Sequence, residues 1–131
     1  MPCRGVRGAI CAESNELHTI IDATRRLLQR IVDANSIQKE DVAGIVFTAT
    51  PDLDAAYPAL GAREMGWTDV PLLCVQEMAV EGSLTHCIRV LLSWNTELPQ
   101  AHIRHVYLGK ARQLRPDLAQ SPSEEERTCP A

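Results

Sequence analysis

The sequence places an arginine inside one of its most apolar segments. Arg89 stands within Ile88–Leu92, whose other residues are all aliphatic, as in a buried strand. If this strand is central, the guanidinium needs an anionic partner, because a buried charge without one is costly. Glu77 or a bound ligand could be that partner. If the strand lies at an edge, Arg89 is an ordinary surface residue, and the pattern alone leaves both interpretations open.

Two arginines near the start of the chain cannot serve one pocket in the same way. Arg4 and Arg7 are an odd number of positions apart in a predicted strand, so their side chains point to opposite faces. Arg7 is followed by Gly8 and Ala9, which are small enough to let a ligand approach the backbone. Where arginines converge, their planar fork matches a carboxylate. The chemistry that these residues indicate is therefore the binding of an organic anion.

Three other residues carry weaker signals. Arg63 falls on a predicted helix and Arg115 follows the last predicted strand, and each alone is typical of a protein surface. Cys74 lies at the end of a predicted buried strand. A small buried hydrophobe is the simpler interpretation of Cys74, because a nucleophilic cysteine needs a neighbouring base or cation. A hydrogen-bonding role for its thiol remains open.

The composition excludes several classes of protein. The chain has 131 residues, the size of one ordinary domain, and its 45% of hydrophobic residues suffices for a core. Its net charge of −4 argues against a nucleic-acid binder, which would need a basic surface. No apolar run approaches the roughly 20 residues that span a bilayer. We therefore expect neither nucleic acid nor membrane as a partner.

The cysteines indicate a reducing compartment. They number five, none is in a C-x-x-C arrangement, and the chain begins without an apolar leader. We therefore expect a cytoplasmic protein without disulfides and without a metal site. Cys11, Cys87 and Cys129 are expected to be inert. The isolated glycines form no dinucleotide or Walker motif, so no nucleotide cofactor is expected either.

Hydrophobic periodicity predicts the elements that must position these residues. Apolar residues recur at the helical period from Leu17 to Val32, with Ser14 or Asn15 as the N-terminal cap and Asn35 as the stop. The other predicted elements are strands at Val6–Cys11, Ala43–Thr50, Val70–Val75, Ile88–Trp94 and His105–Leu108, and a helix from Pro58 to Met65 closed by Gly66.

These elements define the expected fold class, α/β or α+β. We expect one mixed sheet flanked by one long and one short helix, in a single domain over residues 1–118. The last residues, 119–131, are rich in Ser, Pro and Glu and predict a flexible polar tail. The helices are too few to cover the apolar strands, which suggests that one sheet face is buried by other copies of the chain.

Several short segments, taken together and in order, carry a family resemblance. They are Arg4–Ala9, Thr48–Leu53, Tyr57–Ala59, Arg63–Glu64, Val70–Met78, Cys87–Val90, Asn95–Thr96, Pro99–Gln100, Ile103–Leu108 and Leu114–Leu118. This set resembles the monofunctional chorismate mutases of the AroH class. Each piece is weak alone, but the resemblance covers nearly all of the chain from Arg4 to Leu118 with similar spacing.

The resemblance implies a function and an assembly. It implies an isomerase of the shikimate pathway that converts chorismate to prephenate without a cofactor, for phenylalanine and tyrosine biosynthesis. It also implies a homotrimer, a pseudo-α/β-barrel with active sites between subunits. By position, Arg89 matches a catalytic arginine beside the ether oxygen of the breaking bond, and Glu77 and Cys74 match groups that meet the ring hydroxyl. The residues that match substrate-binding positions are Arg7, Tyr57, Ala59, Arg63, Leu73, Tyr107, Leu114 and Arg115.

Two positions depart from the family pattern, and other functions compete with it. Leu60 stands where some members carry a lysine, and Tyr57 stands where phenylalanine is common. One alternative is a non-catalytic trimeric module that binds small carboxylates, and a weaker one is a deaminase-like enzyme acting on small imines. A bare carboxylate binder needs an arginine clamp, but it does not need Glu77 and Cys74 beside Arg89.

Overall fold

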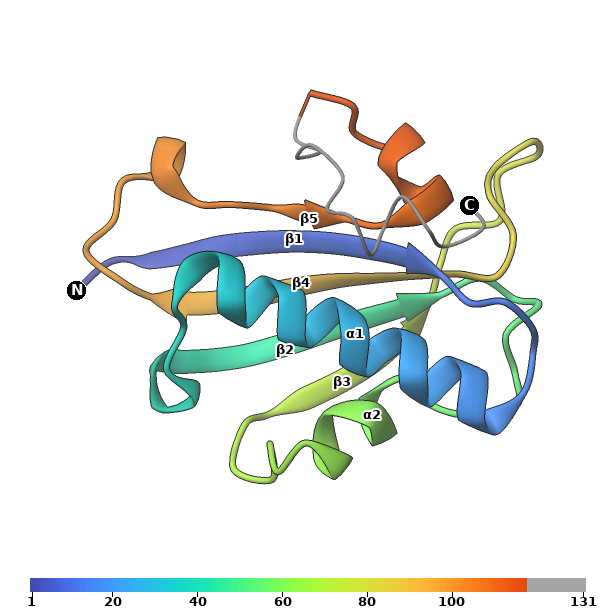
Figure 1. The fold of residues 1–131 in the computed structure, drawn as a ribbon, viewed down its shortest axis with the longest axis horizontal. Helices are drawn as coiled ribbons and strands as arrows, with labels where there is room; N and C mark the ends of the chain where they lie inside the picture. The colour runs from blue at the N-terminus through green and yellow to red at the C-terminus, as the bar shows by residue number, and fades with distance from the viewer. Residues whose placement is uncertain (118–131) are drawn as a thin grey trace.

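The computed structural model describes residues 1–117, which contain one five-stranded sheet (Figure 1). The strand order is β3-β2-β4-β1-β5, in which β4 is antiparallel to β1 and β2, whereas β3 and β5 are parallel to their neighbours. The elements are β1 (Cys3–Cys11), α1 (Leu17–Asn35), β2 (Val42–Ala49), α2 (Ala59–Glu64), β3 (Leu72–Gln76), β4 (Cys87–Asn95) and β5 (Val106–Tyr107). The predicted mixed sheet with one long and one short helix is confirmed. The predicted tail at 119–131, with Cys129, lies outside the described residues.

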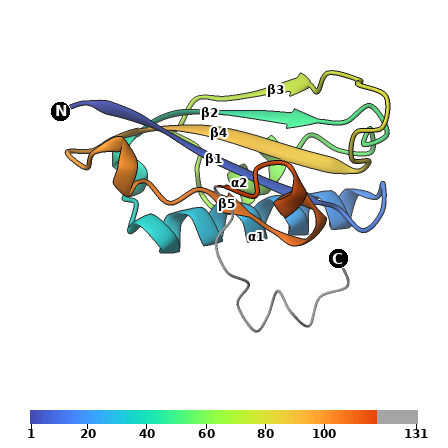
Figure 2. The same ribbon diagram turned by 90° about the horizontal axis from the view of Figure 1, so that it is seen from above.

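The apolar stripe of α1 forms the centre of the core. Ile20, Leu27, Leu28 and Ile31 are fully buried, and both helices lie against the same face of the sheet (Figure 2). The helical period predicted this element well, because only a continuous stripe can stay buried along a helix. No helix within residues 1–117 is long and apolar enough to cross a membrane.

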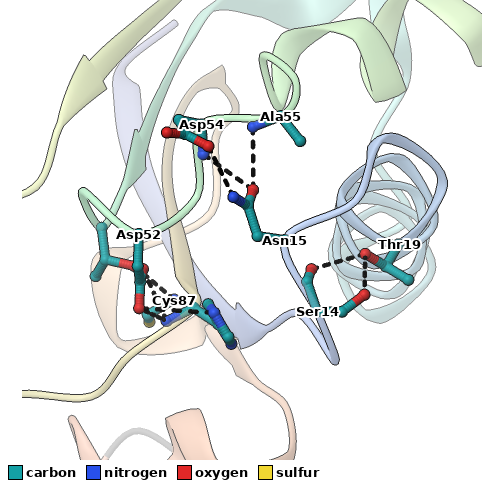
Figure 3. Close-up of polar contacts among 9 residues, drawn as sticks. Ser14, Asn15, Thr19, Asp52, Asp54, Ala55 and Cys87 are labelled. Carbon is teal, nitrogen blue, oxygen red and sulfur yellow. Dashed lines mark hydrogen bonds and ion pairs between the residues drawn. The ribbon is translucent and has the colours of Figure 1, made fainter.

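The predicted N-caps of α1 are wrong, but its predicted end at Asn35 is confirmed. Glu16 is the N-cap and makes no side-chain cap hydrogen bond, whereas Asn35 is the last helical residue and Ser36 after it adopts the left-handed conformation. Ser14 hydrogen-bonds the Thr19 hydroxyl instead. Asn15 uses its amide oxygen to accept the backbone N–H groups of the loop at 54–55, both at 3.0 Å (Figure 3). Asn15 therefore holds the loop at 54–55 against the start of α1, and neither side chain caps the helix.

Gly8 faces the helices, so the prediction that it admits a ligand is wrong. A Cβ atom on Gly8 would lie 2.8 Å from Cδ1 of Ile31 and 3.0 Å from the carbonyl oxygen of Val106. The first distance is too short for a real contact and the second is unusually tight, so the missing side chain serves the packing of α1 and β5 on β1. Gly66, with φ +90°, follows α2 as predicted, in a conformation that favours glycine.

The other face of the sheet carries no α-helix within residues 1–117 and is partly apolar. Only the short 3-10 helix Gly109–Gln113 packs on its end, where the buried Ala111 lies against Ala9 and Tyr107. Leu73, Val75 and Leu91 are 59%, 41% and 47% exposed, and the strand register puts all three on this open face with Val46. The prediction of a buried strand at Val70–Val75 is wrong for the single chain, because β3 begins at Leu72 and is an exposed edge strand. The expected uncovered sheet face is present.

Candidate active site

Arg89 lies at the centre of the open face. The strand that holds it, β4, runs in the middle of the sheet, and Arg89 is paired in register with Ala9 of β1 and Thr48 of β2. The edge-strand interpretation is therefore excluded. Its Nε lies 3.1 Å from Oε2 of Glu77, and the Arg89 side chain is 30% exposed. Glu77 is thus the anionic partner that the sequence had offered as one of two possibilities.

The Glu77 carboxylate is held by two further donors. The Thr48 hydroxyl donates to Oε2 at 2.7 Å, and the Met78 backbone N–H donates to Oε1 at 3.2 Å. Sequence reasoning missed Thr48 as a member of the site. The available signal was alternation, because an apolar strand that carries Thr48 on the face opposite Phe47 must direct its hydroxyl toward the open side. With both oxygens engaged, the carboxylate is oriented before any ligand binds.

Removing the Thr48 hydroxyl should disturb this carboxylate without disturbing the core. For Thr48→Val we expect kcat to fall by about tenfold, since a hydrogen bond to a charged group contributes roughly 1.5–3 kcal/mol. Steady-state turnover of chorismate, the substrate that the family resemblance implies, measures the loss, and a circular dichroism melt checks the fold. Thr48→Ser keeps the hydroxyl and should restore most of the rate. Equal rates for the Val and Ser variants would show that the Thr48 hydroxyl has no role in the site.

The buried Tyr107 lies close to three arginines, Arg7, Arg89 and Arg115. It pairs with Ala9, is 2% exposed, and its hydroxyl has no hydrogen-bond partner within residues 1–117. Burial raises the pKa of Tyr107, and the charges of Arg7, Arg115 and Arg89 act in the opposite direction. A buried hydroxyl with no partner, close to several cations, is suited to donate to an anionic ligand.

Arg4 takes no part in this cluster. Its Nε donates to the carbonyl oxygen of Leu98 at 3.1 Å, on a side of β1 different from that of Arg7. Strand alternation predicted this separation correctly. The cluster of Arg7, Arg89, Tyr107 and Arg115 is called the arginine cluster below.

Arg115 is the peripheral member of the arginine cluster. Its Nη2 and Nε lie 2.8 and 3.0 Å from the two carboxylate oxygens of Asp117, and it is 41% exposed. The neighbouring Leu114 packs against the apolar group that contains Tyr107. The segment can therefore bring a cation to the site, but the cation must exchange Asp117 for a ligand carboxylate.

Removing this segment should mainly weaken substrate capture. A chain that ends at Gln113 is expected to show a KM raised about tenfold, the loss of one charge-assisted contact, with a smaller change in kcat. Initial rates over a range of concentrations of chorismate, the substrate that the resemblance implies, separate the two constants. An unchanged KM would show that the segment does not hold the substrate.

His105 connects the middle of β1 to the segment before β5. The backbone N–H of Arg7 donates to Nδ1 of His105 at 3.0 Å, so that nitrogen must be unprotonated. Burial lowers the pKa of His105 below 6.5, and the charges of Arg7 and Arg115 lower it further. The imidazole is therefore neutral in the folded protein at neutral pH.

This neutral histidine makes stability depend on pH in acid. The unfolded chain binds the His105 proton more readily than the folded chain, so the stabilisation is complete above pH 6.5 and is lost as the pH falls below it. We expect the free energy of unfolding in urea to decrease from pH 7 toward pH 5. In His105→Asn, whose amide oxygen can still accept from Arg7, that decrease should be smaller. An identical pH dependence in both proteins would contradict the assignment.

The remaining predicted site residues lie elsewhere on the chain. Tyr57 and Cys74 line a groove of about 450 Å³ between β3 and the loop after β2, and this groove contains no residue of the arginine cluster. Cys74 is paired with Phe47, so its side chain faces the helices and not Glu77. Leu73 and Arg63 are exposed, whereas Ala59 is only 3% exposed and packs in the core. Within one chain, the predicted site is therefore divided into two parts.

Comparisons with known proteins identify the family. The family model for chorismate mutase type I matches residues 3–118. A chorismate mutase AroH of Thermus thermophilus is 51% identical over 116 residues, which cover 88% of this chain and 95% of the relative. The AroH enzyme of Bacillus subtilis is 47% identical over 120 residues, 91% of this chain and 94% of the relative. A solved chorismate mutase of Clostridium thermocellum is 42% identical with a TM-score of 0.82, over 83% of this chain and 97% of that one.

Matches of this extent leave no doubt about the class of protein. The chain belongs to the type I chorismate mutase family, and its fold is the AroH-like α+β fold. It is an isomerase with chorismate mutase activity. The resemblance seen in the sequence is thereby confirmed.

Proposed function

We propose that the chain rearranges chorismate to prephenate at the arginine cluster, with Arg89 as the group that lowers the barrier. The observation that carries this proposal is the ion pair of Arg89 with an oriented Glu77, in the middle of an uncovered sheet face. The reaction is a concerted rearrangement, so it calls for positioned charges rather than for a nucleophile.

Each group has a part in this proposal. Arg7, Arg115 and the Tyr107 hydroxyl hold carboxylates and keep the flexible enolpyruvyl arm folded over the ring, which supplies the near-attack geometry. As the carbon–oxygen bond lengthens, negative charge grows on the ether oxygen. A fixed guanidinium at that oxygen stabilises the transition state more than the substrate, as a gain in kcat requires.

Glu77 provides the hydrogen-bond acceptor at the end of the pocket that receives the ring hydroxyl. Its carboxylate, held by Thr48 and the Met78 N–H, is suited to accept a hydrogen bond from the ring hydroxyl. A module that only bound dicarboxylates would gain nothing from a carboxylate at this place, since it would repel the ligand. The oriented Glu77 therefore favours the enzyme over the binding module.

We further propose that the site is completed between copies of the chain in a homotrimer. The open face carries exposed Leu73, Val75 and Leu91, and apolar patches of this kind mark interaction sites. The groove with Tyr57 and Cys74 would then face the arginine cluster of a neighbouring copy. In this arrangement Cys74 meets the ring hydroxyl from the chain opposite the one that supplies Glu77.

A single assay tests the proposed reaction. Purified protein is incubated with chorismate, whose loss is followed by ultraviolet absorbance, and the product is identified as prephenate. Sedimentation equilibrium on the same sample should give three times the 14.5 kDa mass of the chain. A folded trimer that leaves chorismate unchanged would favour the binding module.

A cytoplasmic location remains our proposal and agrees with the four free thiols among residues 1–117.

A further inference from the structure

Two cysteines that the proposed reaction does not use lie side by side at the end of the sheet. Cys11 of β1 is the register partner of Cys87 of β4, and both side chains are on the open face. Cys87 is 2% exposed and packs with Ala9 and Tyr107, while Cys11 is half-buried at the edge of the same group. One thiol is therefore enclosed and its neighbour is partly accessible.

The backbone holds the pair at a distance that a disulfide requires. The Cys87 carbonyl accepts from Thr50 N–H, and the Cys87 N–H donates to the Thr50 hydroxyl, both at 3.0 Å, so the polar backbone groups of Cys87 are directed to the end of β2. The next pair is joined by Ala12 N–H to His86 O at 2.7 Å. Cys11 and Cys87 thus form a non-hydrogen-bonded antiparallel pair, whose Cα atoms lie about 4.5 Å apart. Disulfides span roughly 4.4–6.8 Å between Cα atoms.

The accessible thiol of the pair is the more acidic one, as thiol–disulfide exchange at Cys11 requires. A hydrogen bond from Cys87 lowers the pKa of Cys11, burial opposes that effect, and the charge of Lys110 adds to it. The hydrogen bond to Cys11, together with burial, raises the pKa of Cys87. The partly accessible sulfur is therefore the better thiolate, and its neighbour keeps the proton.

We propose that Cys11 and Cys87 form a reversible dithiol–disulfide site that exchanges with small disulfides such as oxidised glutathione. The Cys11 thiolate attacks one glutathione sulfur, and the other glutathione leaves as a thiolate. Cys87 then transfers its proton to the glutathione thiolate released in the first step and attacks the Cys11 sulfur, which releases the second glutathione as a thiolate. Two protein thiols are oxidised, and one small disulfide is reduced to two thiols. Because Cys87 packs with Tyr107, this bond forms at the wall of the arginine cluster. The proposal replaces the expectation that both cysteines are inert.

Thiol mapping tests this site without reference to catalysis. The folded protein is equilibrated in glutathione buffers from fully reduced to fully oxidised, quenched with an alkylating reagent, and digested under non-reducing conditions. We expect a peptide pair linked through Cys11 and Cys87, the loss of two alkylatable thiols, and full reversal by dithiothreitol. If the oxidised folded protein gave no such linked pair, or gave it only after denaturation in urea, the proposal would be wrong.

Single variants test the direction of attack. Cys87→Ser lacks the second thiol and should retain glutathione on Cys11, whereas Cys11→Ser should retain little glutathione at the enclosed Cys87. Cys3→Ser removes an exposed thiol at the other end of β1 and should form the linked pair as the parent does. Glutathione retained equally by the first two variants would contradict the assignment of Cys11 as the attacking thiol. The linked pair in the parent protein remains interpretable even if a variant folds poorly.

Discussion

Replacing Arg89 by alanine is expected to lower kcat by at least about 100-fold while the protein still folds. Loss of one preorganised donor to a developing oxyanion costs on the order of 3–4 kcal/mol in the transition state. The fold should persist because Glu77 keeps its contacts with Thr48 and the Met78 N–H. Steady-state chorismate turnover gives the rate, and sedimentation checks the assembly.

Two further variants define what the Arg89 result means. Arg89→Gln offers a neutral hydrogen-bond donor and should recover little activity, because the charge supplies most of the stabilisation. Arg4→Ala removes an arginine of the same strand pair whose Nε donates to the Leu98 carbonyl, away from the arginine cluster, and it should leave the rate unchanged. Near-parental turnover by Arg89→Ala would make the central assignment wrong.

An acidic residue at Leu91 is expected to abolish assembly and activity together. Leu91 is 47% exposed in the middle of the open face, so Leu91→Asp would place an unpaired carboxylate where we propose that another copy packs. Without that copy the arginine cluster lacks the groove that positions the substrate. Misplacement of about 1 Å can already cost about 100-fold in rate, so we expect at least that loss.

A matched control separates assembly from a general effect of charge. Leu17 is 53% exposed at the first turn of α1, on the other side of the molecule, where an aspartate suits the helix N-terminus. Leu17→Asp should therefore remain a fully active trimer. A monomeric Leu91→Asp protein with full activity would show that one chain suffices, and a trimeric one would show that the open face is not the interface.

The elements whose hydrophobic residues recur with a regular period could be predicted from the sequence. The stripe from Leu17 to Val32 predicted α1, and the aliphatic run around Arg89 predicted a strand that proved to be central. The N-cap at Glu16 could not be predicted, because the better capping side chains of Ser14 and Asn15 bond Thr19 and the loop after β2 instead. Such partners depend on the tertiary fold and leave no mark on local spacing.

The site shows the same division between local pattern and pairing. Alternation separated Arg4 from Arg7 correctly, since it depends only on position within one strand. The face of the sheet on which the Cys74 side chain lies depends on the pairing of Cys74 with Phe47 of β2. The role of Thr48 depends on the position of Glu77 after β3. The exposure of β3 had a different cause. Its apolar residues predicted burial, but no element within residues 1–117 covers the open-face side of that edge.

The claim that Arg89 favours the transition state over the substrate has one direct test. The affinity of a stable bicyclic dicarboxylate shaped like the transition state is measured by calorimetry for the parent and for Arg89→Ala, beside the KM for chorismate. We expect the affinity for this compound to fall by about 100-fold or more, in step with kcat/KM, while KM changes little. A KM that rises by the same factor, with kcat unchanged, would show that Arg89 only binds substrate and would contradict the account.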